Sequence, residues 1–411
     1  MKFNIKKNFS KISSVVYMGS SVISFGLAFL INVILTNYSV NDAVYGQYKY
    51  ATNFILTIPA IFSMGITWSC ASLIAKKDVK RKEGIITVSV FYTIIIGVIV
   101  TIGLYIIYVL TNKGELAGLE GVSITFPFVS AFLLQKLVNQ IYTGLGQSLK
   151  LSLYNVAPNL IVILGLLLSA FLFKNLNFKF AILLYLFSYM IIIIPKMISL
   201  KYDFMDFKEN SKILLHDVKS NGFKVHISSV FTTSSTQIIA LACGNIYGYS
   251  EYGYYSLAAS LAIIFQLIGS SVAVVNFKHY ANVDRISRKD LYFMVGLGGI
   301  AYVCMYALID IVFFWFYPES FAPTIFYLKI LCFSNMIFGY TSLFNRFFIG
   351  KGMGGKVMKN SFITAIATVV VNIPMIIMFE MKGMAISSVI VSFLCLWSYI
   401  YEYKNYIKTI N

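Results

Sequence analysis

The sequence predicts an all-α polytopic membrane protein, with twelve transmembrane helices in two six-helix halves of parallel orientation around a central cavity. Composition is the first observation behind this fold class: 58% of the 411 residues are apolar, 12% are charged, and the mean hydropathy is +0.78. These values lie outside the usual range of soluble domains. The second and third observations are the length of the apolar stretches and a repeated sequence pattern.

The apolar stretches predict helices rather than barrel strands, because they are continuous instead of alternating with polar residues. Each can cross a hydrocarbon core of roughly 30 Å, which takes about 20 helical residues. Prolines within the spans are expected to kink them, at Pro59, Pro127, Pro158, Pro195 and Pro374. The predicted spans cover residues 12–36, 48–74, 85–110, 122–146, 152–173, 179–200, 223–242, 253–276, 291–316, 322–349, 357–379 and 383–403.

Basic residues between the spans predict the orientation, since Lys and Arg favour cytoplasmic loops. With the N-terminus inside, the connections rich in basic residues, such as 76–82 and 196–224, fall on the cytoplasmic side, and so does the C-terminus. The net charge of +17 follows from this bias together with contact with anionic lipid, so no nucleic-acid partner is expected. The lysine-rich N-terminus precedes an apolar run of full span length, which favours a first span over a cleaved signal peptide.

Two sequence patterns recur in the two halves of the chain. YGQYKYA begins at Tyr45 and YGYYSLA at Tyr252, 207 residues later, while NQIYTGLG begins at Asn139 and NRFFIGKG at Asn345, 206 residues later. Because six spans return the chain to its starting side, the halves share one orientation and should be related by an axis along the membrane normal. The predicted domains are an N-terminal half at 1–200, a cytoplasmic amphipathic linker at 201–222 and a C-terminal half at 223–411.

The twelve spans, the YGxY turn before spans two and eight, the G-x-G closures of spans four and ten and the basic inner loops resemble the bacterial oligosaccharide-lipid flippases. These are the O-antigen or capsule repeat-unit translocases of the multidrug/oligosaccharidyl-lipid/polysaccharide exporter superfamily. The resemblance implies a plasma (inner) membrane protein that moves an undecaprenyl-pyrophosphate-linked glycan from the inner to the outer face by alternating access. The implied partners are that lipid-linked glycan, membrane lipids, and a glycan polymerase with other assembly proteins.

A flippase for this substrate needs cations for the pyrophosphate, and polar and aromatic side chains for the sugars. Span four offers four polar residues at i, i+3 and i+4 spacings, which share one helix face: Gln135, Lys136, Asn139 and Gln140. Lys136 lies about midway along its span, and no acidic residue occurs in that span or in the preceding one. An intramembrane cation of this kind predicts a functional site. The alternative is that Lys136 extends toward the inner headgroups.

Further candidates for substrate binding lie on spans that line the cavity in the family resembled: Lys49, Asn53, Lys224, His226, Gln237 and Arg346. His226 is expected to be solvated near a membrane face rather than to carry protons. Arg346 is expected to extend toward the headgroups, from where it could also reach a substrate headgroup. Asp310 and Lys329 lie equally far from the turn between spans nine and ten, so they should form a structural ion pair at one depth.

Nucleotide binding is not expected, although Gly350 to Lys356 fits the spacing of a phosphate-binding loop. Val357 stands where Ser or Thr would bind magnesium, and a membrane helix precedes the loop instead of a strand. An ion gradient, the membrane potential or the substrate gradient must therefore supply the energy. Asp310 is the only acid placed within a span, which weakens the alternative of an ion-coupled drug or small-molecule exporter of the same superfamily, because such exporters use embedded carboxylates.

The remaining alternative is a membrane glycan polymerase or acyltransferase. Such an enzyme needs a catalytic constellation at an aqueous face, and the histidines (His216, His226 and His279) occur without a Ser/His/Asp or metal-ligand set around them. The five cysteines are scattered without paired spacing and predict neither a disulfide nor a metal site. The chain is therefore expected not to be an enzyme and to bind no cofactor or metal.

Overall fold

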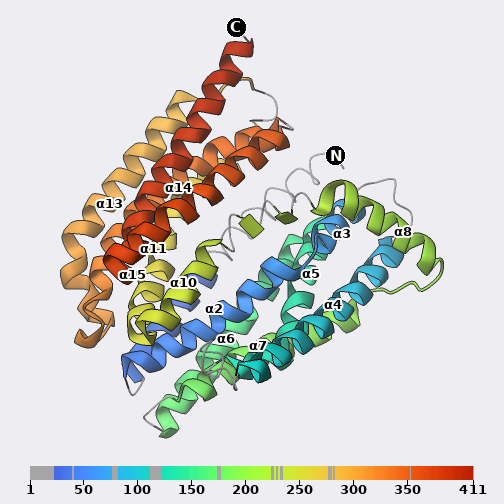
Figure 1. Ribbon diagram of the computed structural model, residues 1–411, viewed down its shortest axis with the longest axis horizontal. Helices are drawn as coiled ribbons and strands as arrows, with labels where there is room; N and C mark the ends of the chain where they lie inside the picture. The colour runs from blue at the N-terminus through green and yellow to red at the C-terminus, as the bar shows by residue number, and fades with distance from the viewer. Residues whose placement is uncertain are drawn as a thin grey trace, which may run out of the picture. The chain divides into compact units, whose positions relative to one another are not determined.

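A computed structural model describes the chain over residues 23–38, 41–75, 82–111, 122–145, 147–173, 177–223, 226–227, 230–231, 235–275, 280, 283–351 and 353–410. Over these residues every regular element is a helix. They form two compact units, Met1–Val230 and Phe231–Asn411, which run from blue to green and from yellow to red in Figure 1. The all-helical prediction is confirmed for this part of the chain.

The helices of the first unit pack around α5 (Val129–Gly144), which contacts α2, α3, α4, α6 and α7. The chain enters α5 through a 3₁₀ turn, η1 (Ser123–Phe128), that contains Pro127. Proline is tolerated at such an entry because the first amides of a helix have no partner within it. The other helices are one at Ile23–Tyr38, α2 (Asp42–Phe62), α3 (Ile66–Ala75), α4 (Lys82–Leu110), α6 (Ser148–Phe173), α7 (Phe178–Ser199), α8 (Phe207–Asp217) and the π-helix η2 (Val218–Gly222).

α2 and α3 correspond to one predicted span that is broken, with an angle of 65° between its two parts. α2 begins at the N-cap Asn41, whose side chain accepts a backbone amide hydrogen bond at 3.0 Å. It ends three residues after Pro59, whose ring removes a donor from the helix. Gly65 then adopts a positive φ of 79°, and a Cβ there would lie 2.6 Å from the backbone carbon of Gly222. The break therefore requires glycine for conformation and for space.

The segment predicted as a linker, residues 201–222, contains α8 and η2 and packs within the first unit. α8 contacts α3 and α4, and its Leu214 is fully buried. The backbone amide of Asp203 donates to the Thr87 hydroxyl of α4 at 2.9 Å. The segment is thus attached to the helices before it in the chain, and its location at the membrane surface stays a prediction.

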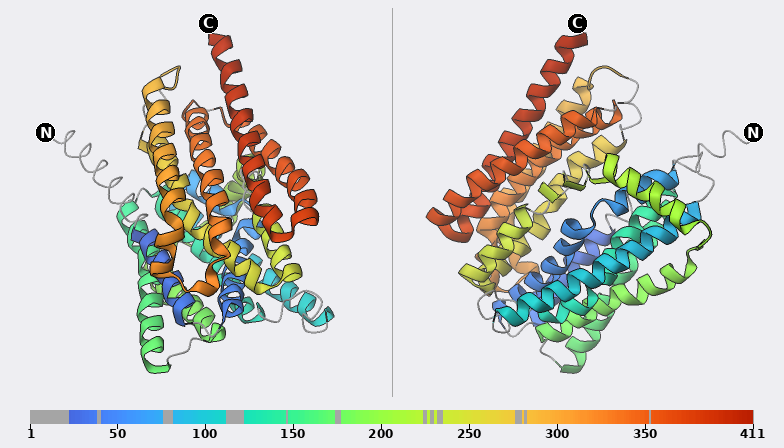
Figure 2. Two further views of the ribbon diagram at one scale, coloured as in Figure 1. Left: turned by 90° about the vertical axis from the view of Figure 1, so that its left-hand side faces the viewer. Right: turned by 45° about the vertical axis from the view of Figure 1, so that its right-hand side comes forward.

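The second unit is built around α14 (Thr324–Gly350), which contacts α11, α13 and α15. α15 (Gly354–Ile410) consists of two arms that meet at Glu380, where φ is 54°, and Figure 2 shows it as a hairpin. Gly383 fits this turn because a Cβ would overlap a backbone carbonyl of the first arm. The other helices are α10 (Ser235–Tyr247), α11 (Tyr249–Val275), α13 (Arg288–Phe316) and the 3₁₀ turn η4 (Glu319–Phe321).

α11 and α14 occupy the repeat positions of α2–α3 and α5, and α11 is continuous where the α2–α3 span is broken. Gly269 of α11 lies against Gly339 of α14, and a Cβ on Gly269 would come within 2.5 Å of the Gly339 backbone. Small residues allow helices to approach this closely in membranes. The tyrosines of both YGxY patterns are buried: Tyr45, Tyr48, Tyr252 and Tyr255.

Five helices among the described residues are long and apolar enough to cross a membrane, or up to six if α2 and α3 are taken as one bent span. α15 counts once in this number although Glu380 divides it. The first predicted span, 12–36, lies partly outside the described residues. The count of twelve spans, the relation between the two halves and the orientation in the membrane therefore stay predictions.

Candidate functional site

Lys136 of α5 lies at the break between α2 and α3. Its ammonium nitrogen Nζ donates to the Pro59 carbonyl oxygen at 2.8 Å and to the Ser63 hydroxyl at 3.2 Å. Among the ion pairs of the described residues, none involves Lys136. The cation that the sequence singled out is therefore held by a carbonyl and a hydroxyl oxygen.

His226 contacts the same break. The residue is 4% exposed, with Nδ1 3.3 Å from the Ser63 hydroxyl oxygen and Nε2 3.0 Å from the Ile61 carbonyl oxygen. The expectation that His226 is solvated is wrong, because its ring is buried against the end of α2. The structure thus brings two predicted residues, Lys136 and His226, to one hydroxyl group, that of Ser63, which the sequence analysis did not single out.

The end of α2 explains how a lysine charge is held there without a carboxylate. The last four carbonyls of a helix have no partner within it, and Pro59 and Ile61 belong to this last turn. Unpaired carbonyls in a hydrocarbon environment cost several kcal/mol each. The helix C-terminus also carries about half a negative charge, which stabilises a nearby cation. Lys136 and His226 therefore cap α2, and about half a positive charge is left uncompensated.

Side chains of α5 that neighbour Lys136 in the sequence form an aromatic and amide surface together with tyrosines of α7. The Tyr189 ring centroid is 5.2 Å from that of Phe132 and 4.9 Å from that of Tyr185, and the side chain of Gln135 lies beside the Tyr189 hydroxyl. Tyr48 of the first YGxY pattern packs edge-on against Tyr185, with ring centroids 6.3 Å apart. Rings and carboxamides of this kind offer both an apolar face and polar groups to a sugar.

The other candidates of the first unit lie on α2 and α5. On α2, Lys49 is half-buried with Nζ 5.7 Å from the Tyr45 ring centroid, and Asn53 is half-buried one turn further on. On α5, the side-chain oxygen of Asn139 is buried without a hydrogen-bond partner in the described structure, and Gln140 is half-buried. Asn139 therefore has an acceptor available.

Two of the predicted residues, Gln237 and Arg346, belong to the second unit. Gln237 of α10 is half-buried, and Arg346 of α14 is exposed. Lys224 lies outside the described residues. Their assignment to substrate binding stays a prediction.

Asp310 of α13 and Lys329 of α14 form an ion pair, with Lys329 Nζ 2.7 Å from a carboxylate oxygen. The ammonium also lies 4.8 Å from the ring centroid of Tyr306. The Asp310 side chain is 59% exposed on the second unit, so the pair is at the surface of that unit. Its purely structural role stays a prediction.

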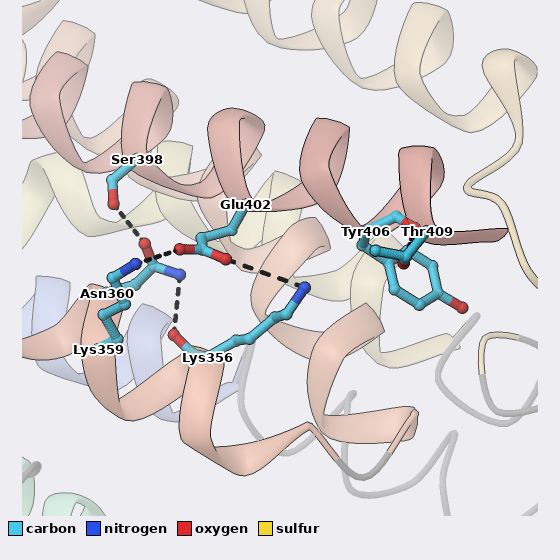
Figure 3. Close-up of polar contacts among 7 residues, drawn as sticks. All are labelled: Lys356, Lys359, Asn360, Ser398, Glu402, Tyr406 and Thr409. Carbon is cyan, nitrogen blue, oxygen red and sulfur yellow. Dashed lines mark hydrogen bonds and ion pairs between the residues drawn. The ribbon is translucent and has the colours of Figure 1, made fainter. Parts of the chain in front are cut away.

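The sequence analysis missed a cluster at the open end of the α15 hairpin (Figure 3). Glu402 is 7% exposed, and its carboxylate accepts a hydrogen bond from Lys359 at 2.7 Å and lies 3.9 Å from Lys356 Nζ. The fully buried Asn360 accepts a hydrogen bond from Ser398 of the second arm. Asp310 is therefore not the only acid within a predicted span, since Glu402 falls in 383–403.

A signal for this cluster was present in the sequence. Lys359 lies 21 residues before Glu380 and Glu402 lies 22 residues after it. Lys359 and Glu402 are therefore nearly equally far from one turn, as Asp310 and Lys329 are. Glu402 was overlooked because it stands one residue inside the predicted end of the last span, where polar residues are usually assigned to the interface.

A further ion pair joins two connections outside the predicted spans. Lys351, just after α14, donates to Asp284, which precedes α13, at 2.8 Å. This hydrogen bond raises the pKa of the Lys351 ammonium. The hydroxyl of Tyr403 accepts the backbone amide of Ile286 at 2.8 Å. These contacts tie the connection before α13 to the ends of α14 and α15.

The chemistry of the Lys136 cluster suits binding of an anion. A hydroxyl beside an imidazole is part of a catalytic triad, but here the Ser63 oxygen accepts from an ammonium, which makes it a poorer nucleophile. No group of three or more His, Cys, Asp or Glu side chains that could hold a metal ion occurs in the described part of the chain. The cluster offers a positive charge and hydrogen-bond donors instead.

Comparison with known proteins places the chain in a family. The model of the family described as "Polysaccharide biosynthesis protein" matches residues 12–277, more than half of the chain, and the chain belongs to that family. A comparison with curated proteins found no match.

Solved structures of transporters share the fold. The chain is similar to the lipid II flippase MurJ in an inward closed conformation, with a TM-score of 0.75 and 14% identity over 95% of this chain and 87% of that one. It is similar to an inward-facing multidrug resistance MATE family transporter of the MOP superfamily, with a TM-score of 0.72 and 16% identity over 94% and 95% of the two chains. A MOP superfamily transporter from Pyrococcus furiosus gives a TM-score of 0.60 and 13% identity over 98% and 96%.

The chain thus shares the all-helical fold of this flippase and of these MOP superfamily transporters. The family match in turn connects the chain with polysaccharide biosynthesis. The resemblance inferred from the sequence is confirmed for the family and for the fold. The solved structures that share the fold are transporters and flippases, whereas a transport role for this chain, rather than an enzymatic one, stays a prediction.

Proposed function

We propose that this protein is a flippase that carries an undecaprenyl-pyrophosphate-linked oligosaccharide from the inner to the outer face of the plasma membrane. The observation that carries the proposal is Lys136, a cation at the interior of a predicted span that has no carboxylate partner in the described structure. An ammonium held by neutral oxygens keeps a positive field, and a phosphate is the natural anion to complete it.

The neighbouring groups fit the rest of the headgroup. Gln135 and the rings of Phe132 and Tyr189 provide the amide and aromatic contacts that a sugar uses. Asn139 adds a buried oxygen acceptor on the same helix. We assign Lys136 to the pyrophosphate and this surface to the first sugars, while the polyprenyl chain stays in the bilayer. Lys49, Asn53, Gln140, Lys224, Gln237 and Arg346 are assigned to the wall of the central cavity.

The test is deletion of the gene in its host, followed by location of the lipid-linked glycan that accumulates. In intact spheroplasts, single repeat units should be inaccessible to an impermeant sugar-modifying reagent, because they remain on the inner face. Unpolymerised units on the outer face would instead identify a polymerase or another modifying enzyme. Polymerase and other assembly proteins are further partners that co-purification in mild detergent would detect.

The membrane potential is the proposed driving force. A headgroup with about two negative charges that moves outward against an inside-negative potential releases roughly 2.3 kcal/mol per charge for each 100 mV. Collapsing the potential in sealed vesicles should therefore slow export. Export that continues at an unchanged rate would exclude this driving force.

Ion-coupled export of a drug or small molecule is the second candidate, and Glu402 is the observation that favours it. Exporters of this kind use carboxylates embedded in their spans, and Glu402 is buried within a predicted one. Its two lysine neighbours argue against a coupling role, because the carboxylate is already paired with their ammonium groups. Resistance to cationic drugs in the deletion strain distinguishes the two: a flippase mutant should keep it.

A further inference from the structure

We infer that Ser63 and His226 are positioning residues, which form with Lys136 a hydrogen-bond chain of fixed direction and aim one ammonium N–H at the substrate phosphate. The inference rests on the proposed function, because it assumes that Lys136 binds the pyrophosphate. It adds two residues that act through Lys136 and assigns the protonation state in which they do so.

The two ends of the chain determine its direction. An ammonium can only donate hydrogen bonds and a carbonyl can only accept them. Because Lys136 donates to the Ser63 oxygen at 3.2 Å, the Ser63 hydroxyl proton is available for His226 Nδ1 at 3.3 Å. Nδ1 then acts as the acceptor, and Nε2 carries the ring proton that it donates to the Ile61 carbonyl at 3.0 Å. Every group in the chain is satisfied when His226 is neutral with its proton on Nε2.

The opposite direction fails at the serine. If His226 were an imidazolium, Nδ1 would donate to the Ser63 oxygen, which would then lie between two cations. The Ser63 proton would lose its acceptor in the chain, and an unsatisfied buried hydroxyl is costly. The geometry therefore selects one tautomer of one charge state.

The hydrogen-bond chain also determines which N–H group of Lys136 remains available to the substrate. An ammonium has three N–H groups, and two are committed to Pro59 and Ser63. The third has no partner among the described residues. Since the first two bonds set the rotation of the ammonium about its Cε–Nζ bond, the direction of the third is set as well.

The backbone around the hydrogen-bond chain is closely packed, so the positions of Ser63 and His226 determine the direction of the third N–H group. Ser63 is the C-cap of α2, directly before the two residues with positive φ, Met64 and Gly65. Gly65 packs on the backbone of Gly222, which lies four residues before His226 in the sequence. His226, Ser63 and Lys136 thus come from three segments that meet at one break, and displacing any of them moves the ammonium.

The tautomer can be tested on the unaltered chain. Nitrogen-15 spectra of histidine-labelled protein in lipid nanodiscs should show His226 as a neutral ring with the proton on Nε2 at neutral pH, assigned by loss of its signal in His226→Gln. A proton on Nδ1, or an imidazolium, would overturn the inference, and the result does not depend on whether a serine variant folds.

Binding measurements supply the second test, with undecaprenyl pyrophosphate as the probe for the nanodisc-embedded protein. Ser63→Ala and His226→Phe should raise Kd by about tenfold, which is the usual cost of losing a hydrogen bond to a charged group. Ser63→Thr keeps the hydroxyl and His226→Gln keeps one acceptor and one donor, so both should stay within about threefold of the original. Matched controls are Ser270→Ala, since the Ser270 hydroxyl bonds only within α11 at 3.2 Å, and the exposed His216→Gln.

The outcomes separate the inference from the proposed function. If Lys136→Met binds the probe as well as the original protein, the proposed site is wrong. If Lys136→Met loses binding while Ser63→Ala and His226→Phe keep it, the site stands and the positioning role is excluded. Loss in Ser63→Ala together with rescue in Ser63→Thr supports both.

Discussion

The broken span α2–α3 and the continuous helix α11 begin with the same YGxY pattern, yet only the first is interrupted. In the first unit α2 ends shortly after Pro59, the backbone turns at Gly65, and Lys136 donates to the Pro59 carbonyl at the break. The second unit has Gln266, Val272 and Ser342 at the corresponding repeat positions. There α11 runs on and closes against α14 through Gly269 and Gly339.

This difference teaches that the repeat sets the helical framework while the site depends on a few departures from it. A serine stands at both positions, Ser63 and Ser270, but only Ser63 has lost its helical surroundings, because Ser270 bonds back to the Leu267 carbonyl of its own helix. The corresponding positions of the second unit lack the proline, the glycine and the lysine of the first.

The largest effect on stability is expected from Gly65→Val. The substitution introduces valine at φ 79° and within 2.6 Å of the Gly222 backbone, so both strain and overlap should destabilise the first unit, by about 3–5 kcal/mol. The matched exchange Val272→Gly at the equivalent position of α11 should cost about 1 kcal/mol from helix propensity. Thermal unfolding in detergent measures both. Equal losses in the two variants would mean that the break has no special geometry.

A smaller effect is expected from Gly269→Ala in the second unit. The added methyl group would come within 2.5 Å of the Gly339 backbone, and overpacking of this kind costs about 1–3 kcal/mol. Gly299→Ala on α13 is the control, since nothing lies within 4 Å of its Cβ position. If both alanine variants unfold at the same temperature as the unaltered protein, α11 and α14 are not packed as closely as described.

The smallest effect on stability is expected from Glu402→Gln. This change keeps the shape but removes the charge that Lys359 and Lys356 share, and it should cost about 1–2 kcal/mol because Lys359 can turn to solvent. Transport of the lipid-linked glycan should stay within about threefold, since the cluster ties the arms of α15 rather than binding substrate. Complete loss of transport in a variant that folds normally would favour the ion-coupled exporter.

The fold class and most helix positions were predictable because hydropathy and loop charge act over whole spans. The predicted spans 85–110 and 179–200 correspond closely to α4 at 82–110 and α7 at 178–199. The cation of the site was predictable too, since a lysine within an apolar run is costly and therefore conspicuous. The Asp310–Lys329 contact followed from equal distances to one turn.

The rest depended on contacts that sequence separation hides. In the sequence Ser63 has no distinguishing feature, because its role depends on the break that follows it. Its hydrogen bond with His226 joins residues 163 positions apart. His226 was expected to be solvated because nothing nearby in the sequence shows that the end of α2 would bury it. The exact break required the glycine contact between Gly65 and Gly222, which no local pattern encodes.

The most direct test of the account is transport by purified protein in liposomes that carry a fluorescent undecaprenyl-pyrophosphate oligosaccharide. Lys136→Met should slow transfer between leaflets by at least about 30-fold, because a charge-assisted contact worth roughly 2 kcal/mol or more is removed. Ser342→Ala, at the equivalent position of the second half, should transfer at the original rate. Transfer by Lys136→Met at the original rate, or equal losses in both variants, would contradict the claim that the cation at the broken span binds the substrate.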